Sequence, residues 1–441
     1  MTDGATAAVV RLSREAAASI PAGTLAIAKA CVRDFLALAL AGSREPVAAI
    51  LREAALAEGA YPIATVLGSG RRFSLRQAAL INGAAGHALD YDDVALGMFV
   101  HPTTVLLPPL LAFAEARALS GHRLLAAFVA GYEAAGMIGA WLGSAPYDRG
   151  FHMTGTVGAI GAAAGCAHLI GLDAEATARA LGLAATQAAG LKAQFGTMAK
   201  PLHAGRAAET GLVSALWAEA GMTGRCDMLE ARQGFAETQF ALPDREIRWD
   251  GYQLDGNSFK FHAACFGVQG AFEAIGALRR DGLRSADVAA VRLTVHPKAD
   301  RMCNIAAPRT GAEAKFSLRF AAALALDGRD TADPATFADA IVADPRLDQF
   351  RALTTVTLAP AHWPDEMTQV DIDTLDGRRL QRSHDMAARL SIEEAEPALR
   401  RKFEALLRPV LPGDRVAALT HAVELLDEAE TVDSLLAAAA T

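Results

Sequence analysis

Basic or titratable side chains recur at every third position in the stretch 196–208, namely Lys200, His203 and Arg206. Pro201 has a restricted φ and disfavours helix at the residue before it, so we expect Lys200 to end a loop and a helix to begin at Pro201. Residues three apart share a helix face, which would point His203 and Arg206 the same way. Because neighbouring cations favour the neutral form of a lysine, Lys200 is a candidate base. The alternative is a basic helix start that faces solvent; the flanking glycines and apolar residues favour a pocket.

A second group of titratable residues lies in the stretch 86–93, where Asp90, Asp92 and Asp93 fall close together. Carboxylates at such short spacing repel one another unless one is paired or protonated. His101 follows soon after, could exchange protons near neutral pH and could be the partner of one of these carboxylates. The alternative is a helix end with a solvated acidic turn. The spacing matches no H-E-x-x-H motif, so we expect no metal.

A polar loop containing Tyr147 and His152 leads into a glycine-rich helix that we expect from about Thr154. Helix N-termini attract anions through their free amide groups and the helix dipole. His152 and Thr154 would therefore lie where a carboxylate could bind. Capping of the helix by Thr154 is the competing interpretation, and the two roles are compatible.

The stretch from Lys260 to Cys265 lies at the junction between two segments that differ in their pattern of apolar residues. Pockets are frequent at domain junctions, so Lys260 and Cys265 are candidate substrate-binding residues. A single cysteine is more commonly a small buried hydrophobe than a nucleophile.

Composition narrows the class of protein. A chain of 441 residues with 52% hydrophobic and 21% charged residues is a globular protein of two domains. A net charge of −8 without a basic stripe argues against nucleic-acid binding. The five cysteines are scattered, as in a reduced cytoplasm, and Met1 to Glu15 lacks an apolar signal core. The apolar stretch 154–172 contains His168, so we expect a buried helix and no membrane span.

The pattern of apolar residues changes near residue 250. The first 255 or so residues carry helical spacing, with stripes such as Ile27, Cys31 and Phe35. The following segment predicts strands over 287–295, 352–358 and 368–374, the last in a hairpin through Asp376-Gly377, with helices over 267–280, 314–325 and 336–343. The tail predicts helices over 397–406 and 415–440, and we expect it to pack on the first domain.

These stretches together resemble the MmgE/PrpD family, whose members include 2-methylcitrate dehydratase, cis-aconitate decarboxylase and iminodisuccinate epimerase. Six segments in family order carry the resemblance: 82–93, 101–102, 150–152 with the glycine helix after it, 200–205, 260–265 and 313–317. The resemblance implies a mainly α fold, with a large all-α domain over 1–257 and 394–441 and a smaller α+β lid domain over 258–393. It also implies a homodimer without a metal or an organic cofactor.

The resemblance carries family active-site positions onto Asp90, His101, His152 and Lys200, which keep the residue type. The animal decarboxylase of the family has a histidine where this chain has Cys265 and a tyrosine where it has Phe320, and a further histidine that is common in the family falls on Gln269. These departures argue against cis-aconitate decarboxylation. Tyr147 is our candidate for the missing phenol.

We therefore expect a cytoplasmic enzyme that abstracts a proton α to a carboxylate of a small di- or tricarboxylate. The base would be Lys200 or His101, with Asp90 orienting His101, and His152 or Tyr147 would be the acid. His203, Arg206, Thr154, Lys260 and Cys265 would bind substrate. The outcome would be a hydro-lyase, like 2-methylcitrate dehydratase, or an epimerase. A catalytically silent carboxylate-binding protein and, more weakly, a metal hydrolase are the alternatives.

Overall fold

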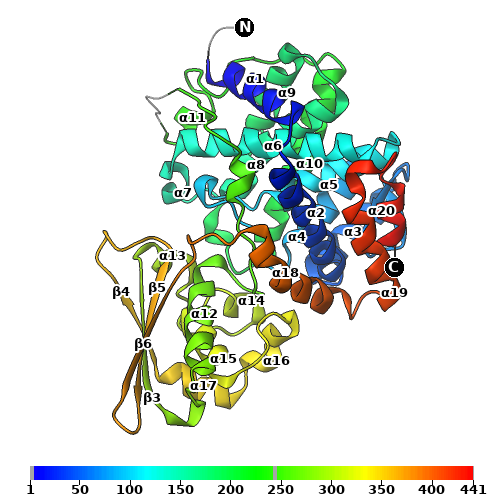
Figure 1. Ribbon diagram of the computed structural model, residues 1–441. Coiled ribbons are helices and arrows are strands. Elements are labelled where there is room, and N and C mark those ends of the chain that lie inside the picture. Colours follow the sequence, from blue (N-terminus) through cyan, green and yellow to red (C-terminus); the bar gives the residue numbers. More distant parts are fainter. Residues whose placement is uncertain (1–3, 242–245, 441) are drawn as a thin grey trace. The chain divides into compact units, whose positions relative to one another are not determined.

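The computed structural model describes residues 4–241 and 246–440 (Figure 1). The chain forms two compact units, the first within residues 1–194, 198–259 and 406–441, and the second within 195–197 and 260–405. The sequence prediction placed these divisions at 257/258 and 393/394. The first unit is almost entirely helical and the second combines a sheet with helices, so the expected mainly α fold is confirmed.

The first unit consists of helices of varied length and one small hairpin. Its elements are α1 (Ala5–Ala18), α2 (Ala22–Gly42), α3 (Pro46–Glu58), β1 (Ala64–Val66), β2 (Arg71–Phe73), α4 (Leu75–His87), η1 (Leu96–Met98), α5 (Thr103–Ala116), α6 (Gly121–Leu142), α7 (Ala145–Arg149), α8 (Met153–Ile170), α9 (Ala174–Ala185), η2 (Lys192–Gln194), α10 (Ala199–Glu219), α11 (Phe235–Thr238), η3 (Gln253–Gly256), α19 (Gly413–Glu424), η6 (Leu426–Glu428) and α20 (Asp433–Ala438). The tail helix α19 packs on α2, as expected.

Helix α10 lies at the centre of this unit, packed against α4, α5, α8 and α9. Two glycines permit this close packing. A Cβ on Gly205 would lie 2.3 Å from the carbonyl oxygen of Leu80 on α4, and a Cβ on Gly211 would lie 2.3 Å from the Cβ of Ala162 on α8. Any larger residue would force the helices apart, so these glycines bring the start of α10 next to the ends of its neighbours.

The start of α10 differs from the sequence prediction. The helix begins at Ala199, so Lys200 lies in its first turn and not at the end of a loop. Pro201 is accommodated because the first-turn amides of a helix have no intrahelical partner to lose.

Two helices, α6 and α8, are long and apolar enough to cross a membrane by length and composition. Their apolar windows are 94% and 89% buried inside the first unit. Both are therefore core helices, and the prediction of a buried helix near 154–172 is confirmed for Met153–Ile170.

The second unit contains a sheet with helices on one face. Its elements are α12 (Phe266–Arg280), η4 (Ser285–Asp287), β3 (Val288–Val295), α13 (Lys298–Cys303), α14 (Gly311–Ala314), α15 (Leu318–Asp327), η5 (Pro334–Phe337), α16 (Asp339–Val342), α17 (Pro345–Ala352), β4 (Thr354–Leu358), β5 (Met367–Thr374), β6 (Arg379–Asp385) and, for most of its length, α18 (Ile392–Leu407).

The strand order of this sheet is β4-β3-β5-β6, with β3 and β4 parallel and the other pairs antiparallel. Helix α12 packs on β5 and β6, and α15 packs on β4 (Figure 1). In β5 every second residue is buried, which is the pattern of a sheet covered on one face.

The predicted strands and the hairpin through Asp376-Gly377 are confirmed. Several helix boundaries were wrong. The predicted helix over 314–325 is α15, which begins only at Leu318 after the separate short helix α14, and that over 336–343 is η5 followed by α16. Helix α18 begins at Ile392 and contains Pro397, and the long tail helix is broken into α19, η6 and α20. The hairpin of β1 and β2 was not predicted, because these strands are too short to show a period.

Candidate active site

A cluster of acidic and basic side chains lies at the ends of four helices in the first unit. The members come from the last residue of α4, the turn after it, the segment before α5, the N-cap of α8 and the start of α10: His87, Asp90, Asp92, His101, His152, Lys200 and His203. His87, Asp92 and Lys200 expose only 1%, 2% and 4% of their surface. Buried charges are costly unless they are paired, so the pairing within the cluster decides its chemistry.

Lys200 and Asp90 form a buried ion pair. The Nζ atom of Lys200 lies 2.8 Å from Oδ1 of Asp90. Asp90 has a φ of 50°, in the left-handed region, which aspartate tolerates better than most residues. Strained conformations of this kind cluster at functional sites. Lys200 is therefore paired with a carboxylate, whereas the sequence had suggested a lysine crowded by cations.

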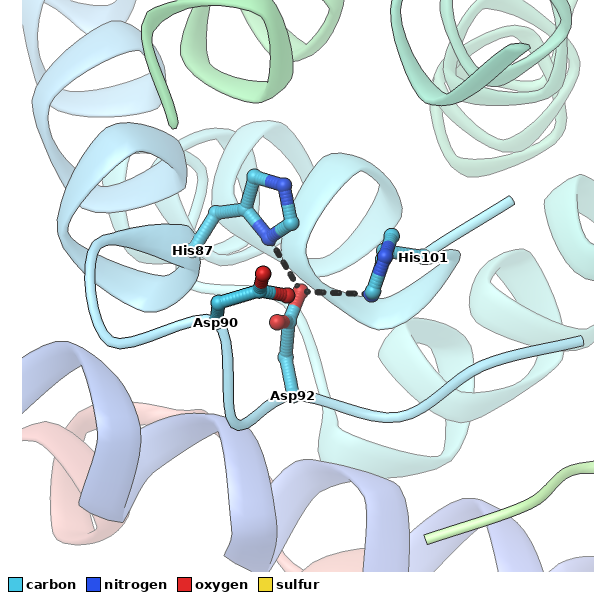
Figure 2. A group of neighbouring side chains, drawn as sticks. All are labelled: His87, Asp90, Asp92 and His101. Atoms are coloured by element: carbon cyan, nitrogen blue, oxygen red, sulfur yellow. Dashed lines mark hydrogen bonds and ion pairs between the residues drawn. The ribbon is translucent and has the colours of Figure 1, made fainter. Parts of the chain in front are cut away.

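Asp92 contacts two imidazoles. Its Oδ2 atom lies 2.7 Å from Nδ1 of His87 and 3.4 Å from Nδ1 of His101 (Figure 2). Burial acts to raise the pKa of Asp92, but the two imidazoles outweigh it and hold that pKa well below its usual value. The carboxylate next to His101 is therefore Asp92. Asp90, which we had predicted to orient His101, pairs with Lys200 instead.

The hydrogen bonds of His101 define which of its nitrogens is basic. Nδ1 lies 3.0 Å from the backbone carbonyl oxygen of Asp93 and faces the Asp92 carboxylate. Both groups can only accept, so Nδ1 carries the proton and, in the neutral ring, Nε2 carries the lone pair. The backbone N–H of His101 donates to Oγ1 of Thr154 at 3.1 Å. Thr154 thus fixes His101, and the helix cap is His152.

His152 and His203 form a histidine pair, with their Nδ1 atoms 3.1 Å apart. One ring must donate and the other accept, so the two hold opposite tautomers when neutral. Burial, and then the charge of Lys200, lowers the pKa of His152 well below its usual value. Burial, His87 and Lys200 also lower the pKa of His203, which is half-buried. Both rings are therefore neutral at physiological pH.

The cluster is compact. Ligand-type atoms of His87, Asp90, Asp92 and His101 all lie within 4.8 Å of one another, close enough for a cation (Figure 2). Lys200 already places an ammonium against Asp90, and the imidazoles take up Asp92. The chain itself thus supplies one cation, Lys200, to this site.

Arg206 and Tyr147, which we had predicted as site residues, make contacts with residues that are not members of the cluster. The guanidinium of Arg206 pairs with Glu209, and its side chain is 58% exposed, so Arg206 lies outside the buried cluster. Tyr147 lies on α7, where its ring stacks on Phe99 with centroids 5.1 Å apart and Lys192 Nζ lies 3.4 Å from the ring centroid.

The other predicted residues belong to the second unit. Lys260 is completely buried, and Cys265 is buried directly before α12. The amide of Gln269 donates to the carbonyl oxygens of His262 and Ala264, so Gln269 holds the loop that carries Cys265. Phe320 is completely buried in α15.

Sequence reasoning missed His87 and Asp92 as members of the site. Both lie in the acidic stretch that we singled out, but spacing alone did not show that they would bond to each other. The signal available was a histidine at the end of a predicted helix, followed closely by several carboxylates.

Comparison with known proteins identifies the family. The model of the MmgE/PrpD N-terminal domain matches residues 12–248, and that of the C-terminal domain matches residues 262–428. The chain is 33% identical over 286 residues to a cis-aconitate decarboxylase-like protein, oryM, of Aspergillus oryzae, a match that covers 59% of this chain and 58% of that protein. It is 30% identical over 282 residues to a cis-aconitate decarboxylase of Aspergillus terreus, covering 59% of this chain and 57% of the relative.

The chain thus spans less than two thirds of these fungal relatives. A cis-aconitate decarboxylase of Mus musculus is 28% identical over 377 residues, covering 80% of this chain and 76% of the relative. The two domain models together cover most of the sequence, in the order expected from the motifs. This chain therefore belongs to the MmgE/PrpD family.

Proposed function

We propose that this chain is an acid–base enzyme that abstracts a proton α to a carboxylate of a small di- or tricarboxylate and needs neither a metal nor an organic cofactor. It acts as a hydro-lyase or as an epimerase. The observation that carries the proposal is the orientation of His101, whose Nδ1 faces two acceptors, so that Nε2 is the basic nitrogen of the neutral ring.

His101 is the better of the two candidate bases. A general base needs a lone pair, which Nε2 of His101 carries whenever the ring is neutral. The Nζ atom of Lys200 is instead paired with the Asp90 carboxylate at 2.8 Å. We assign Lys200 to electrostatic stabilisation of the negative charge that develops on the substrate when its proton leaves.

The N-termini of two helices are suited to attract the carboxylates of the substrate. Both α8 and α10 begin at the cluster, and their first-turn amides and dipoles favour an anion. His203 is only half-buried and reaches the cluster through His152, so it is placed to meet a ligand entering from solvent.

The acid is His152, with Tyr147 as the second candidate. In the neutral pair, His152 gives up the proton on its Nε2 while its Nδ1 takes the Nδ1 proton of His203. The half-buried His203 takes a proton from solvent at its own Nε2, so both rings stay neutral. If this acid protonates a departing hydroxyl, the reaction is a dehydration. If it returns a proton to the opposite face of the carbanion, the reaction is an epimerisation.

Decarboxylation of cis-aconitate is a second candidate, favoured by the names of the relatives. Loss of carbon dioxide also produces a carbanion that Lys200 could stabilise and an acid could protonate. The replacement of the family tyrosine by Phe320 removes a proton donor and argues against this reaction. By analogy with the family, we also propose a cytoplasmic homodimer.

The decisive experiment is proton NMR in D₂O with the purified protein and a panel of methylcitrate, citrate, cis-aconitate and iminodisuccinate. Deuterium entering an α position without olefinic signals indicates an epimerase. A growing olefinic product from a hydroxy acid indicates a hydro-lyase, and itaconate formed from cis-aconitate indicates a decarboxylase. No reaction across the panel would refute the proposal and favour a carboxylate-binding protein.

Variants test the assigned roles. His101→Asn should lower kcat by about 10²–10⁴-fold, as is typical for loss of a general base. His421→Asn is the matched control, because that side chain is 71% exposed. If His101→Asn retains wild-type kcat, His101 is not the base.

A further inference from the structure

His87 is a buried imidazole that the proposed mechanism does not use. It is the last residue of α4 and is 1% exposed. Its Nδ1 donates to Oδ2 of Asp92 at 2.7 Å, and the same oxygen faces Nδ1 of His101 (Figure 2). One carboxylate oxygen therefore orients both rings.

The other nitrogen of His87 has no hydrogen-bond partner. Among the described residues, Nε2 of His87 is a buried polar atom without a donor near it. Because Asp92 can only accept, Nδ1 holds the ring proton and Nε2 is an acceptor with a lone pair. Leaving a buried acceptor unpaired costs free energy, so such groups in native proteins call for a ligand or an ordered water.

The surroundings of His87 keep this acceptor neutral. Burial, in the first place, and then the charge of Lys200 lower the pKa of His87, although Asp92 and Asp90 act in the opposite direction. The ring lies within the proposed site, with its centroid 4.6 Å from that of His101 and 5.9 Å from that of His152.

We propose that Nε2 of His87 accepts a hydrogen bond from a hydroxyl or amine group of the substrate. This inference rests on the proposed function for the carboxylate class of the ligand, and it narrows that class. The substrate carries an O–H or N–H donor beside its carboxylates, as hydroxy acids and amino-linked dicarboxylates do. A fully ionised unsaturated tricarboxylate such as cis-aconitate has no such donor.

A pair of matched ligands tests the proposal directly. Citrate and tricarballylate carry the same three carboxylates and differ only in the hydroxyl of citrate. By calorimetry, the wild-type protein should bind citrate at least about tenfold more tightly than tricarballylate, since the analogue leaves the buried acceptor unpaired. Malate and succinate provide a second pair with the same difference.

The variant His87→Asn separates hydrogen bonding to substrate from positioning. The asparagine amide can occupy the place of Nδ1 and still donate to Asp92, but it has nothing in the place of Nε2. We expect this variant to bind tricarballylate as the wild type does and to lose its preference for citrate. A wild-type protein that binds both members of each pair equally would overturn the proposal.

A third measurement needs no variant. In protein labelled with ¹⁵N at histidine, a ring in the Nδ1–H form should show its Nε2 resonance shifting on addition of citrate and not on addition of tricarballylate. If neither ligand moves any Nε2 resonance of that form, the proposal fails. Because all these readouts are of binding, absence of turnover would refute the proposed function without deciding this inference.

Discussion

Replacing Gly205 by alanine should force α10 away from α4 and disturb the site from a distance. A Cβ at this position would lie 2.3 Å from the carbonyl oxygen of Leu80. A carbon–oxygen contact is comfortable at about 3.3 Å, so the helices must separate by about 1 Å. The obstacle is backbone and cannot rotate away.

The energetic cost follows from this overlap. Overpacking of a filled core typically costs about 1–3 kcal/mol, and replacing a helical glycine by alanine returns up to about 1 kcal/mol. We therefore expect Gly205→Ala to lower the free energy of unfolding by about 1–2 kcal/mol. Gly23→Ala is the matched control, because a Cβ on Gly23 in α2 meets nothing within 4 Å. That variant should be as stable as the wild type or slightly more stable.

The same displacement should impair catalysis. Lys200 lies on α10 and Asp90 directly follows α4, so separating the helices stretches their 2.8 Å contact. A misplacement of about 1 Å can cost about 10²-fold in rate. Stability is measured by urea titration of tryptophan fluorescence, since Trp141, Trp217 and Trp249 all belong to the first unit. Deuterium exchange into the substrate measures catalysis.

Two results would refute this reasoning. If Gly205→Ala unfolds at the same urea concentration as the wild type, the close approach of α4 and α10 at residue 205 does not contribute to stability. If it is destabilised but keeps full activity, the contact between α4 and α10 does not define the geometry of the site.

Other consequences of the site can be checked as well. Lys200→Met should abolish activity and destabilise the protein by about 3–5 kcal/mol, because it leaves Asp90 buried without its cation; adding Asp90→Asn should restore much of the stability, measured by urea titration, but none of the activity. The lowered pKa of His152 means that the unfolded chain binds more protons on acidification, so stability falls as pH drops below about 6.5. The fall in melting temperature between pH 7 and pH 5 should therefore be smaller in His152→Asn. Prolonged EDTA treatment should leave kcat unchanged, and metal analysis of the purified protein should find less than one ion per chain; stoichiometric metal whose removal abolishes turnover would contradict the proposed chemistry.

Local patterns in the sequence were sufficient for much of the fold. The β-branched content of 288–295 and the Asp376-Gly377 turn are properties of neighbouring residues, and the strands they predicted are present. Helix ends were less predictable. A proline usually marks a helix boundary, but Pro397 lies inside α18. Lys200, which directly precedes Pro201, likewise lies inside α10.

The candidate site, too, was predictable from the sequence in part. Residue type and local motif indicated His101, His152 and Lys200, because titratable groups beside glycines and helix starts can be recognised in the sequence. The resemblance to the family selected Asp90 among three neighbouring carboxylates. The residues that pair with these side chains could not be recognised from the sequence. The pairing of Asp90 with Lys200 joins distant parts of the chain and depends on the contact between α4 and α10.

Tertiary packing also decided which side chains face inward. His203 and Arg206 are three residues apart on α10, which rotates them about 60° from each other around the helix axis. That difference is enough to direct His203 to His152 and Arg206 to solvent and Glu209. The sequence by itself determined the family, the element types and the inventory of acids and bases. Only the packing of helices around α10 decided which base meets which acid, because side-chain partners are chosen by neighbours that lie close in space and far apart along the chain.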